Sequence, residues 1–336
     1  MIENIYQIED INYMVSLFCP GKCRNCSIWK EPFESITQNE ISPEIFEKIL
    51  KSNSLANTNY FNLTAGESQI SSKYPEIVRL ITKYKPDAFI HTNISGWYPE
   101  KHFEVTKECL KWAKPDKFRL DISLDGRKES YEQVRFVENG FDKAVKSAEK
   151  LIDLGILVRF VMVLYRETWH DIEWFVDFAK KTGAGFYLGY PRKSENYIKS
   201  NEKSNYFTKE ELDMLEEKLK KAGWLTERRI SNWLWAKSVY EDRVPYFNCL
   251  MGKKHLVIDP YGNVYPCNEL KKEHLMGNIN EFHGNLDNLL YSEKALSVIK
   301  FIEEKKCQPC GMLCAPKVEF PWGKQDGMIA PEKINV

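Results

Sequence analysis

Three cysteines near the N-terminus are spaced closely enough to bind a single metal centre. Cys19, Cys23 and Cys26 form a CX3CX2C pattern directly after the apolar run 13–18. Three thiolates can hold three irons of a [4Fe-4S] cluster and leave the fourth iron free to bind a substrate or cofactor. Zinc is the alternative, but a closed zinc site needs a fourth ligand, and no histidine follows these cysteines until His91. The spacing therefore favours an iron–sulfur cluster with one open position.

A second group of cysteines lies near the C-terminal end of the chain. Cys249 and Cys267 flank a predicted hairpin with strands at 255–259 and 264–267 around a turn at 260–263, which would bring both thiolates together. The group has three further members: Cys307, Cys310 and Cys314. Four such thiolates suit zinc and an iron–sulfur cluster equally well, so both remain open from the residues alone.

The ninth cysteine, Cys109, stands apart from both groups. It shares the spacing of one helical face with Phe103, Thr106 and Leu110, which predicts a buried structural thiol. The other cysteines are clustered in a chain without an export signal. That pattern favours metal or redox chemistry over a disulfide scaffold.

The composition is that of an ordinary globular protein of 336 residues, long enough for one large domain and a smaller one. Lysine plus arginine equals aspartate plus glutamate at 48 each, so no overall basic field favours nucleic acid as a partner. The N-terminal residues lack the apolar stretch of a signal peptide, and no apolar run is long enough to cross a bilayer. We therefore expect a cytoplasmic protein that binds neither nucleic acid nor membrane.

Strand and helix patterns alternate along the first part of the chain. After a strand that precedes the first cysteines and a helix that begins at Ser42, the predicted strands are 60–64, 88–92, 117–124, 157–165 and 185–190, and the predicted helices are 74–84, 100–112, 142–154 and 171–181. This repeat length implies six β/α units with parallel strands and right-handed crossovers. A doubly wound sheet and a partial barrel are both compatible with the pattern. Further on, Thr208 and Glu211 form a capping box that predicts the start of another helix, and 230–240 predicts a second.

The cysteine loop directly after a first strand resembles the signature of the radical S-adenosylmethionine (SAM) superfamily. Asn25 departs from that signature, because many members have an aromatic residue at this position. The resemblance implies an α/β fold, a partial (β/α)6 barrel with the cluster and SAM at the C-terminal ends of the strands. We expect the barrel at 1–195, a helical linker at 196–245 and a small cysteine-rich domain at 246–336.

The resemblance also implies which residues contact SAM. The segment from Thr64 to Glu67 resembles the family's GGE motif with alanine at the first glycine, and the segment from Ser123 to Gly126 resembles its SLDG motif. A carboxylate suits the amino group of SAM and a guanidinium suits its carboxylate. The implied cofactor contacts are Gly66, Glu67, Asn93, Ser123, Asp125, Arg135 and Leu164.

The second cysteine group resembles the family's twitch and SPASM extensions. Cys249, Gly262 and Cys267 fit the CX9-15GX4C half of that pattern. A full SPASM domain has seven cysteines for two clusters, whereas five here imply one auxiliary [4Fe-4S] cluster. The expected ligands are Cys249, Cys267, Cys307 and Cys310, with Cys314 as the alternative to Cys310.

The resemblance implies an enzyme that cleaves SAM reductively to a 5′-deoxyadenosyl radical and takes hydrogen from a substrate C–H bond. An auxiliary cluster favours oxidative outcomes such as dehydrogenation, with flavodoxin or ferredoxin as electron donor. Only eighteen residues precede Cys19, too few for a peptide-recognition domain, so we expect a polar small molecule such as a sugar or aminocyclitol. A peptide (RiPP) or protein maturase is the alternative enzyme, and a non-catalytic zinc-stabilised binding protein is the alternative of another class.

Overall fold

The computed structural model describes residues 5–24, 26–30, 40–191, 207–241, 249–270, 272–304 and 306–307, and two short strands, β10 (Glu319–Phe320) and β11 (Gly323–Lys324). Asn25, Cys310 and Cys314 lie outside the described residues.

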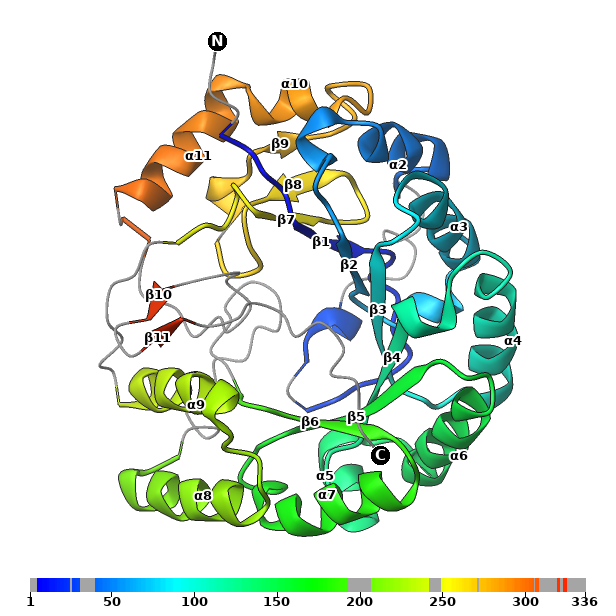
Figure 1. Ribbon diagram of the computed structural model, residues 1–336, viewed down its shortest axis with the longest axis vertical. Helices are drawn as coiled ribbons and strands as arrows, with labels where there is room; N and C mark the ends of the chain where they lie inside the picture. Colours follow the sequence, from blue (N-terminus) through cyan, green and yellow to red (C-terminus); the bar gives the residue numbers. More distant parts are fainter. Residues whose placement is uncertain are drawn as a thin grey trace.

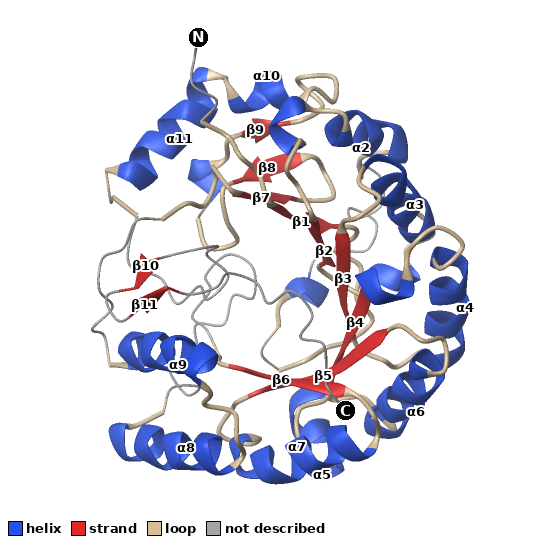
Figure 2. Cartoon of the chain, viewed as in Figure 1, coloured by secondary structure: helices blue, strands red, loops and turns tan. Residues whose placement is uncertain are grey.

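A curved sheet of nine strands forms the centre of the molecule (Figures 1 and 2). Its strands are β1 (Asp10–Met14), β2 (Tyr60–Thr64), β3 (Phe89–Ile94), β4 (Phe118–Ser123), β5 (Leu157–Val163), β6 (Gly185–Gly189), β7 (His255–Ile258), β8 (Asn263–Tyr265) and β9 (Gly277–Asn278). Strands β1 to β6 are all parallel and follow one another in sequence order. The predicted series of six parallel strands is therefore confirmed, and the sheet curves into a partial barrel.

Helices cover the convex side of this sheet, as Figure 2 shows for α2, α3, α4, α6 and α7. The helices are α2 (Pro43–Leu50), α3 (Tyr74–Tyr84), α4 (Pro99–Cys109), α5 (Lys128–Arg135), α6 (Gly140–Ile152), α7 (Ile172–Lys181), α8 (Lys209–Lys221), α9 (Glu227–Tyr240), α10 (Leu286–Leu290) and α11 (Glu293–Glu303). The sequence did not predict α5, α10 or α11. Thr208 caps α8 through the predicted capping box with Glu211. In the part of the chain described here, every helix is too short or too polar to cross a lipid bilayer.

The two faces of the sheet have different compositions because side chains alternate along each strand. Ile11 and Leu63 are fully buried in the hydrophobic core, where they pack with helix residues such as Phe46. Asn12 and Asn62 alternate with these residues and therefore point to the concave, inner face. The core thus lies between sheet and helices, and the inner face carries polar side chains. Cys109 is buried in this core, as predicted.

The hairpin near the C-terminus extends the barrel sheet. Strand β7 pairs in parallel with β1, with His255 opposite Asp10, and β8 pairs with β7 in antiparallel orientation. The sequence predicted this hairpin but placed it in a separate region from 246 onwards. The domain boundaries themselves remain a prediction.

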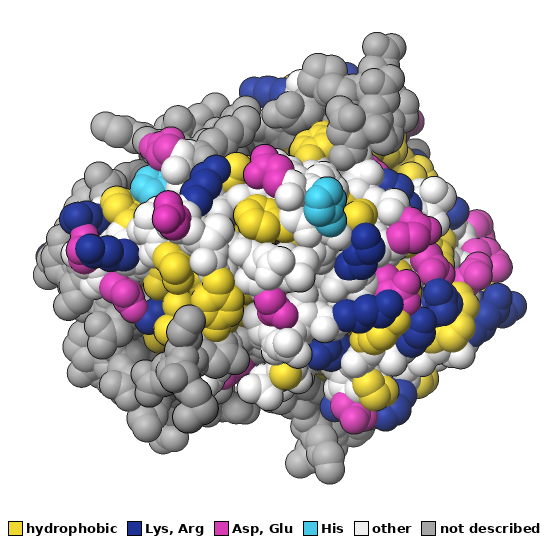
Figure 3. Space-filling model, turned by 90° about the horizontal axis from the view of Figure 1, so that it is seen from above, with side chains coloured by type: hydrophobic (Ala, Val, Ile, Leu, Met, Phe, Trp, Pro, Cys, Tyr) yellow, Lys and Arg dark blue, Asp and Glu magenta, His cyan; other side chains and the backbone are white. Residues whose placement is uncertain are grey.

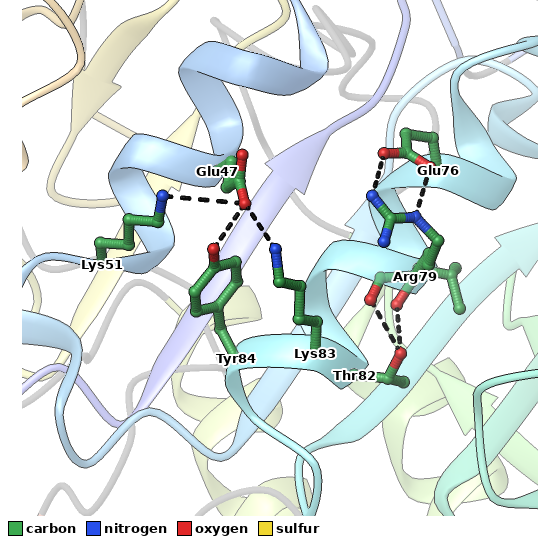
Figure 4. A network of polar contacts seen from close by, with 8 residues as sticks. Glu47, Lys51, Glu76, Arg79, Thr82, Lys83 and Tyr84 are labelled. Carbon is green, nitrogen blue, oxygen red and sulfur yellow. Dashed lines mark hydrogen bonds and ion pairs between the residues drawn. The ribbon is translucent and has the colours of Figure 1, made fainter.

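Polar contacts join α2 to α3 on the outside of the barrel (Figure 4). Glu47 accepts hydrogen bonds from the Tyr84 hydroxyl and from Lys83, whose Nζ lies 2.9 Å from Glu47 Oε1. The bond from Tyr84, followed by that from Lys83, lowers the pKa of Glu47 to about 2. Exposed contacts of this kind contribute little to stability.

Charged side chains of both signs are interspersed on the face shown in Figure 3. This mixture agrees with the equal numbers of acidic and basic residues in the chain.

Candidate active site

The cysteine loop leaves the C-terminal end of β1 and leads to a short 3-10 helix, Ile28–Lys30. Cys19, Cys23 and Cys26 are half-buried free thiols, and the Cys26 amide donates to the Cys23 carbonyl at 3.2 Å. Gly21 allows the loop to pass over a tryptophan, because a Cβ at this position would lie 2.5 Å from the ring of Trp97. The loop is therefore shaped by a close contact that only glycine permits.

Burial makes Cys19 and Cys26 poor acids in the absence of a metal. It raises the pKa of Cys19 to about 12 and also raises the pKa of Cys26. A bound cluster supplies the positive charge that would keep such sulfurs as thiolates. Three free thiols on one tight loop thus fit a cluster held at three corners.

The turn after β2 is bonded directly to this loop. Ala65 and Gly66 both have positive φ angles, 71° and 27°, and the Glu67 amide donates to the carbonyl of Phe18 at 2.7 Å. A Cβ on Gly66 would lie 2.2 Å from the same carbonyl oxygen. The glycine is thus required for the close approach of the two segments, while Ala65 tolerates a backbone conformation that glycine adopts more easily.

The side chain of Glu67 is almost fully buried and only partly satisfied. Its Oε2 accepts from the Ser95 amide at 2.9 Å, whereas Oε1 is buried without a hydrogen bond and lies 3.8 Å from His102 Nε2. Burial raises the pKa of Glu67 to about 7 despite the bonds from Ser95. A buried acceptor with an open position suits a cationic donor such as an ammonium group.

The segment after β4 joins the cysteine loop through an arginine. Arg135 Nε donates to Asp125 Oδ2 at 2.6 Å, and its Nη1 lies 3.7 Å from Cys23 Sγ. Asp125 Oδ1 accepts from the amide of Val163 at 2.8 Å, which ties the pair to β5. Burial lowers the pKa of Arg135, but the charges of Asp125 and Cys23 outweigh it and raise the pKa overall. Arg135 therefore remains a cation beside the predicted cluster.

The other three predicted SAM contacts differ in how deeply their side chains are buried. Asn93 and Ser123 are half-buried near the C-terminal ends of β3 and β4. Leu164 is fully buried in the hydrophobic core, so only its backbone is left for a cofactor contact. Gly66, Glu67, Asp125 and Arg135 thus surround the cysteine loop, and the binding roles of all seven residues remain predictions.

The sequence did not single out three residues of this site, Ser95, Trp97 and His102. Trp97 supports Gly21 and donates from Nε1 to the hydroxyl of Tyr131. Ser95 and Trp97 follow the end of β3, and that position was the one available signal, because parallel α/β folds place their sites at this edge.

The second cysteine group is partly described. Cys267 is buried, and Cys249 and Cys307 are half-buried. Burial, with smaller contributions that include the charges of Cys249 and Cys307, raises the pKa of Cys267 to about 12. Among the described residues, no three His, Cys, Asp or Glu side chains converge on one metal ion, either at this group or at the cysteine loop after β1. The choice between Cys310 and Cys314 lies outside the described residues.

Family comparisons agree with this geometry. The model of the Radical SAM superfamily matches residues 13–179, and the model of SPASM, an iron–sulfur cluster-binding domain, matches residues 249–311. The chain therefore belongs to the radical SAM superfamily and carries a SPASM domain. The cofactors of these domains are a [4Fe-4S] cluster with SAM and an auxiliary iron–sulfur cluster, as predicted.

One relative is named for the biosynthesis of a bacteriocin. The chain is 25% identical over 293 residues to the antilisterial bacteriocin subtilosin biosynthesis protein AlbA of Bacillus subtilis (strain 168), a match that covers 82% of this chain and 57% of AlbA. The chain thus spans little more than half of that relative.

Two solved structures share the fold. Streptococcus suis SuiB bound to SAM superposes with a TM-score of 0.63 at 16% identity, covering 87% of this chain and 68% of SuiB. Native anSMEcpe with bound AdoMet, which is SAM, gives a TM-score of 0.60 at 17% identity, covering 90% of this chain and 88% of that chain. The partial barrel followed by a SPASM-like domain is therefore confirmed.

Proposed function

We propose that this protein is a cytoplasmic radical SAM enzyme that oxidatively modifies a peptide. The observation that carries the proposal is the cysteine loop after β1, which has a partly satisfied carboxylate, Glu67, on one side and a retained cation, Arg135, on another. In a SAM-binding cluster site, the cysteines would bind iron, the carboxylate would bind the ammonium group of SAM, and the arginine would bind the carboxylate of SAM.

When bound, the cluster and SAM supply a 5′-deoxyadenosyl radical that takes hydrogen from a C–H bond. The protein holds and orients these groups. Cys19, Cys23 and Cys26 would ligate three irons, Glu67 would accept from the SAM ammonium, and Arg135 would bind its carboxylate while Asp125 fixes the guanidinium. Asn93 and Ser123 would contact the remaining parts of SAM.

A peptide substrate is better supported than a sugar or aminocyclitol. AlbA acts in the biosynthesis of a bacteriocin, and one SuiB structure contains its precursor peptide SuiA. The small-molecule substrate expected from the sequence has no comparable support. Four of the five C-terminal cysteines would hold the auxiliary cluster, which would supply electron transfer for the oxidation of the substrate, and flavodoxin or ferredoxin would be the electron donor of the enzyme.

Anaerobic reconstitution tests the enzyme class. We expect about eight irons per chain, because each [4Fe-4S] cluster carries four, and 5′-deoxyadenosine after addition of dithionite and SAM. Cys19→Ala should reduce 5′-deoxyadenosine formation by more than about 1,000-fold, equivalent to about 4 kcal/mol of transition-state stabilisation. Cys109→Ala is the matched control, because Cys109 lies in the core away from both cysteine groups. Equal product from both variants would contradict the proposal.

The substrate class is tested with a short peptide encoded beside the gene and, in parallel, with an aminocyclitol. We expect mass spectrometry to show the loss of two hydrogen atoms from the peptide and no change in the aminocyclitol. The reverse result would favour the small-molecule enzyme.

A further inference from the structure

Two arginines share one carboxylate on the inner face of the barrel. Arg119 and Asp121 lie on β4, and Arg159 lies opposite Asp121 on β5. Arg119 Nε is 3.2 Å from Asp121 Oδ1, Arg159 Nε donates to the same oxygen at 3.0 Å, and Arg159 Nη2 donates to Oδ2. Leu120 and Phe160 alternate with these residues and pack in the helix-covered core, so the three charged side chains point inward.

The remaining neighbours do not balance the second guanidinium. His91 Nε2 is 2.8 Å from Asp121 Oδ2 and its Nδ1 is 3.0 Å from the Tyr60 hydroxyl. Burial lowers the pKa of His91 to about 4, so this imidazole is neutral at pH 7. Two guanidinium groups and one carboxylate therefore leave one positive charge. In the described chain, neither arginine has another acidic partner.

Other groups near this cluster do not change the charge count. Asp10 lies on β1, three strands away from β4, and is bonded to His255. The rings of Phe89 and Tyr187 lie 5.1 and 4.8 Å from the guanidinium carbons of Arg119 and Arg159 and orient them without adding a charge. The excess cation is therefore local to the inner face.

This charge is buried as well as unbalanced. Arg119 is 8% exposed, and the Arg159 side chain is 18% exposed. Uncompensated charge in such surroundings is costly, so proteins normally pair it. Nη1 of each arginine has no acceptor in the described chain, so an incoming anion has donors to bind.

The cluster lies next to the proposed SAM contacts. Asp121 is opposite Asn93 on β3 and two residues before Ser123. Two residues of strand correspond to about 7 Å. A group bound to the arginines would thus lie beside Asn93 and deeper in the barrel than Ser123.

Two asparagines on the same face point to a second feature of the ligand. Asn12 and Asn62 are direct partners on β1 and β2, and Asn62 is in turn opposite His91 on β3. Both Oδ1 atoms are buried without a hydrogen-bond partner, and Asn12 is only 7% exposed. Unpaired acceptors of this kind require N–H or O–H donors.

We propose that the inner face binds a carboxylate-bearing segment of a peptide. The carboxylate pairs with Arg119 and Arg159, and backbone N–H groups of the same segment donate to Asn12 and Asn62. The inference rests on the proposed function, which it deepens by specifying an acidic side chain or a C-terminal carboxylate in the substrate.

Small probes test this site on the reconstituted full-length protein with SAM. N-acetylglycine carries one carboxylate and one amide, and N-acetylglycinamide is its uncharged counterpart. We expect saturating N-acetylglycine to raise the midpoint of thermal unfolding by about 3 °C and N-acetylglycinamide to raise it by much less. Equal shifts from both probes would overturn the proposal.

Variants assign the effect to the arginines. Arg159→Gln removes the excess charge and should abolish the shift, whereas Arg159→Lys keeps the charge and should retain most of it. Arg166→Gln is the control, because Arg166 is an exposed arginine paired with Glu211. If Arg159→Gln does not fold, Arg119→Gln makes the same change in charge. A shift that survives neutralisation of either arginine would contradict the assignment.

Inorganic phosphate separates the two sources of negative charge. A larger shift with phosphate than with N-acetylglycine would favour a phosphorylated ligand and overturn the peptide carboxylate. The same samples also report 5′-deoxyadenosine formation. Loss of the probe effect with SAM cleavage intact would end this inference alone, whereas absence of SAM cleavage would end the proposed function.

Discussion

Two buried carboxylates in the same barrel behave in opposite ways. Glu67 and Asp121 are each 2% exposed. Burial raises the pKa of Glu67 to about 7, because only the Ser95 hydrogen bonds and the charge of Arg135 oppose it. Burial also raises the pKa of Asp121, but the charge of Arg159 and the contributions of His91 and Arg119 outweigh it and lower the pKa well below its usual range.

The two carboxylates differ in how many hydrogen-bond and charge partners the barrel provides for each of them. At the C-terminal edge of the sheet, Glu67 keeps an open acceptor position that suits a cation. Deeper in the barrel, both oxygens of Asp121 are paired with arginines. Arg119 and Arg159 together carry one more positive charge than Asp121 can balance, which suits an anion. Under the two proposals above, Glu67 would bind a cationic group of the cofactor, and Arg119 and Arg159 would bind an anionic group of the substrate.

The largest effect on stability is expected from Asp121→Asn. It removes the one carboxylate that two buried guanidinium groups share, and breaking a buried pair in this way costs about 3–5 kcal/mol. Urea unfolding of the wild type and the variant at pH 7 measures the loss. Because the pKa of Asp121 is lowered in the folded state, its contribution exists above the unfolded pKa and disappears as the pH falls below about 4. A variant as stable as the wild type would contradict the claim that the charged form of Asp121, unlike that of Glu67, stabilises the folded protein.

Glu67→Gln should act in the opposite direction on the metal-free protein. The raised pKa of Glu67 means that the folded state binds more protons than the unfolded chain between pH 4.5 and 7, so its contribution to stability is present below pH 4.5 and is lost as the pH rises through 7. The variant should therefore gain up to about 3 kcal/mol at pH 8 and bind SAM more weakly in the reconstituted enzyme.

Glu47→Gln is the matched control for this experiment, because Glu47 is an outer carboxylate whose pKa is lowered (Figure 4). It should show no gain at pH 8. A gain of the same size in both variants, or none in Glu67→Gln, would contradict the role of burial at Glu67.

Gly21→Ala tests how tightly the cofactor edge is packed. Its Cβ would lie 2.5 Å from the Trp97 ring, and overpacking of this kind costs about 1–3 kcal/mol. We expect lower thermal stability together with a reduced iron content after reconstitution. Gly189→Ala on β6 is the control, because a Cβ there meets only ordinary contacts beginning at 3.7 Å. Full iron loading of Gly21→Ala would show that the loop can move away from Trp97.

Ala65→Gly should have the smallest effect, a gain of about 1 kcal/mol, because Ala65 has a φ of 71° that glycine adopts without strain. Chemical denaturation measures it. Ala148→Gly in α6 is the matched control and should lose stability, since helical backbone favours alanine. Equal losses in both variants would mean that Ala65 is not strained.

Local patterns in the sequence predicted much of this structure. The alternation of strands and helices indicated six parallel strands, the capping box indicated the start of α8, and the spacing around Cys109 indicated a buried thiol. The turns at Gly66 and Asp125 were located by motif, because residue type and short spacing decide such features. Helix α5 was missed although it places Arg135 beside Cys23.

The cysteine spacing by itself predicted one metal centre on a single loop, since ligands a few residues apart need no distant partner. Only the tertiary structure decided that β7 continues the barrel sheet beside β1, and that Arg119, Asp121 and Arg159 meet on its inner face. The pairing of β7 with β1 and the meeting of the three charged side chains depend on strand register, and the pKa values of those side chains depend on their burial away from water. Register and burial both arise between segments far apart in the chain, so the charge around each carboxylate became visible only in the folded molecule.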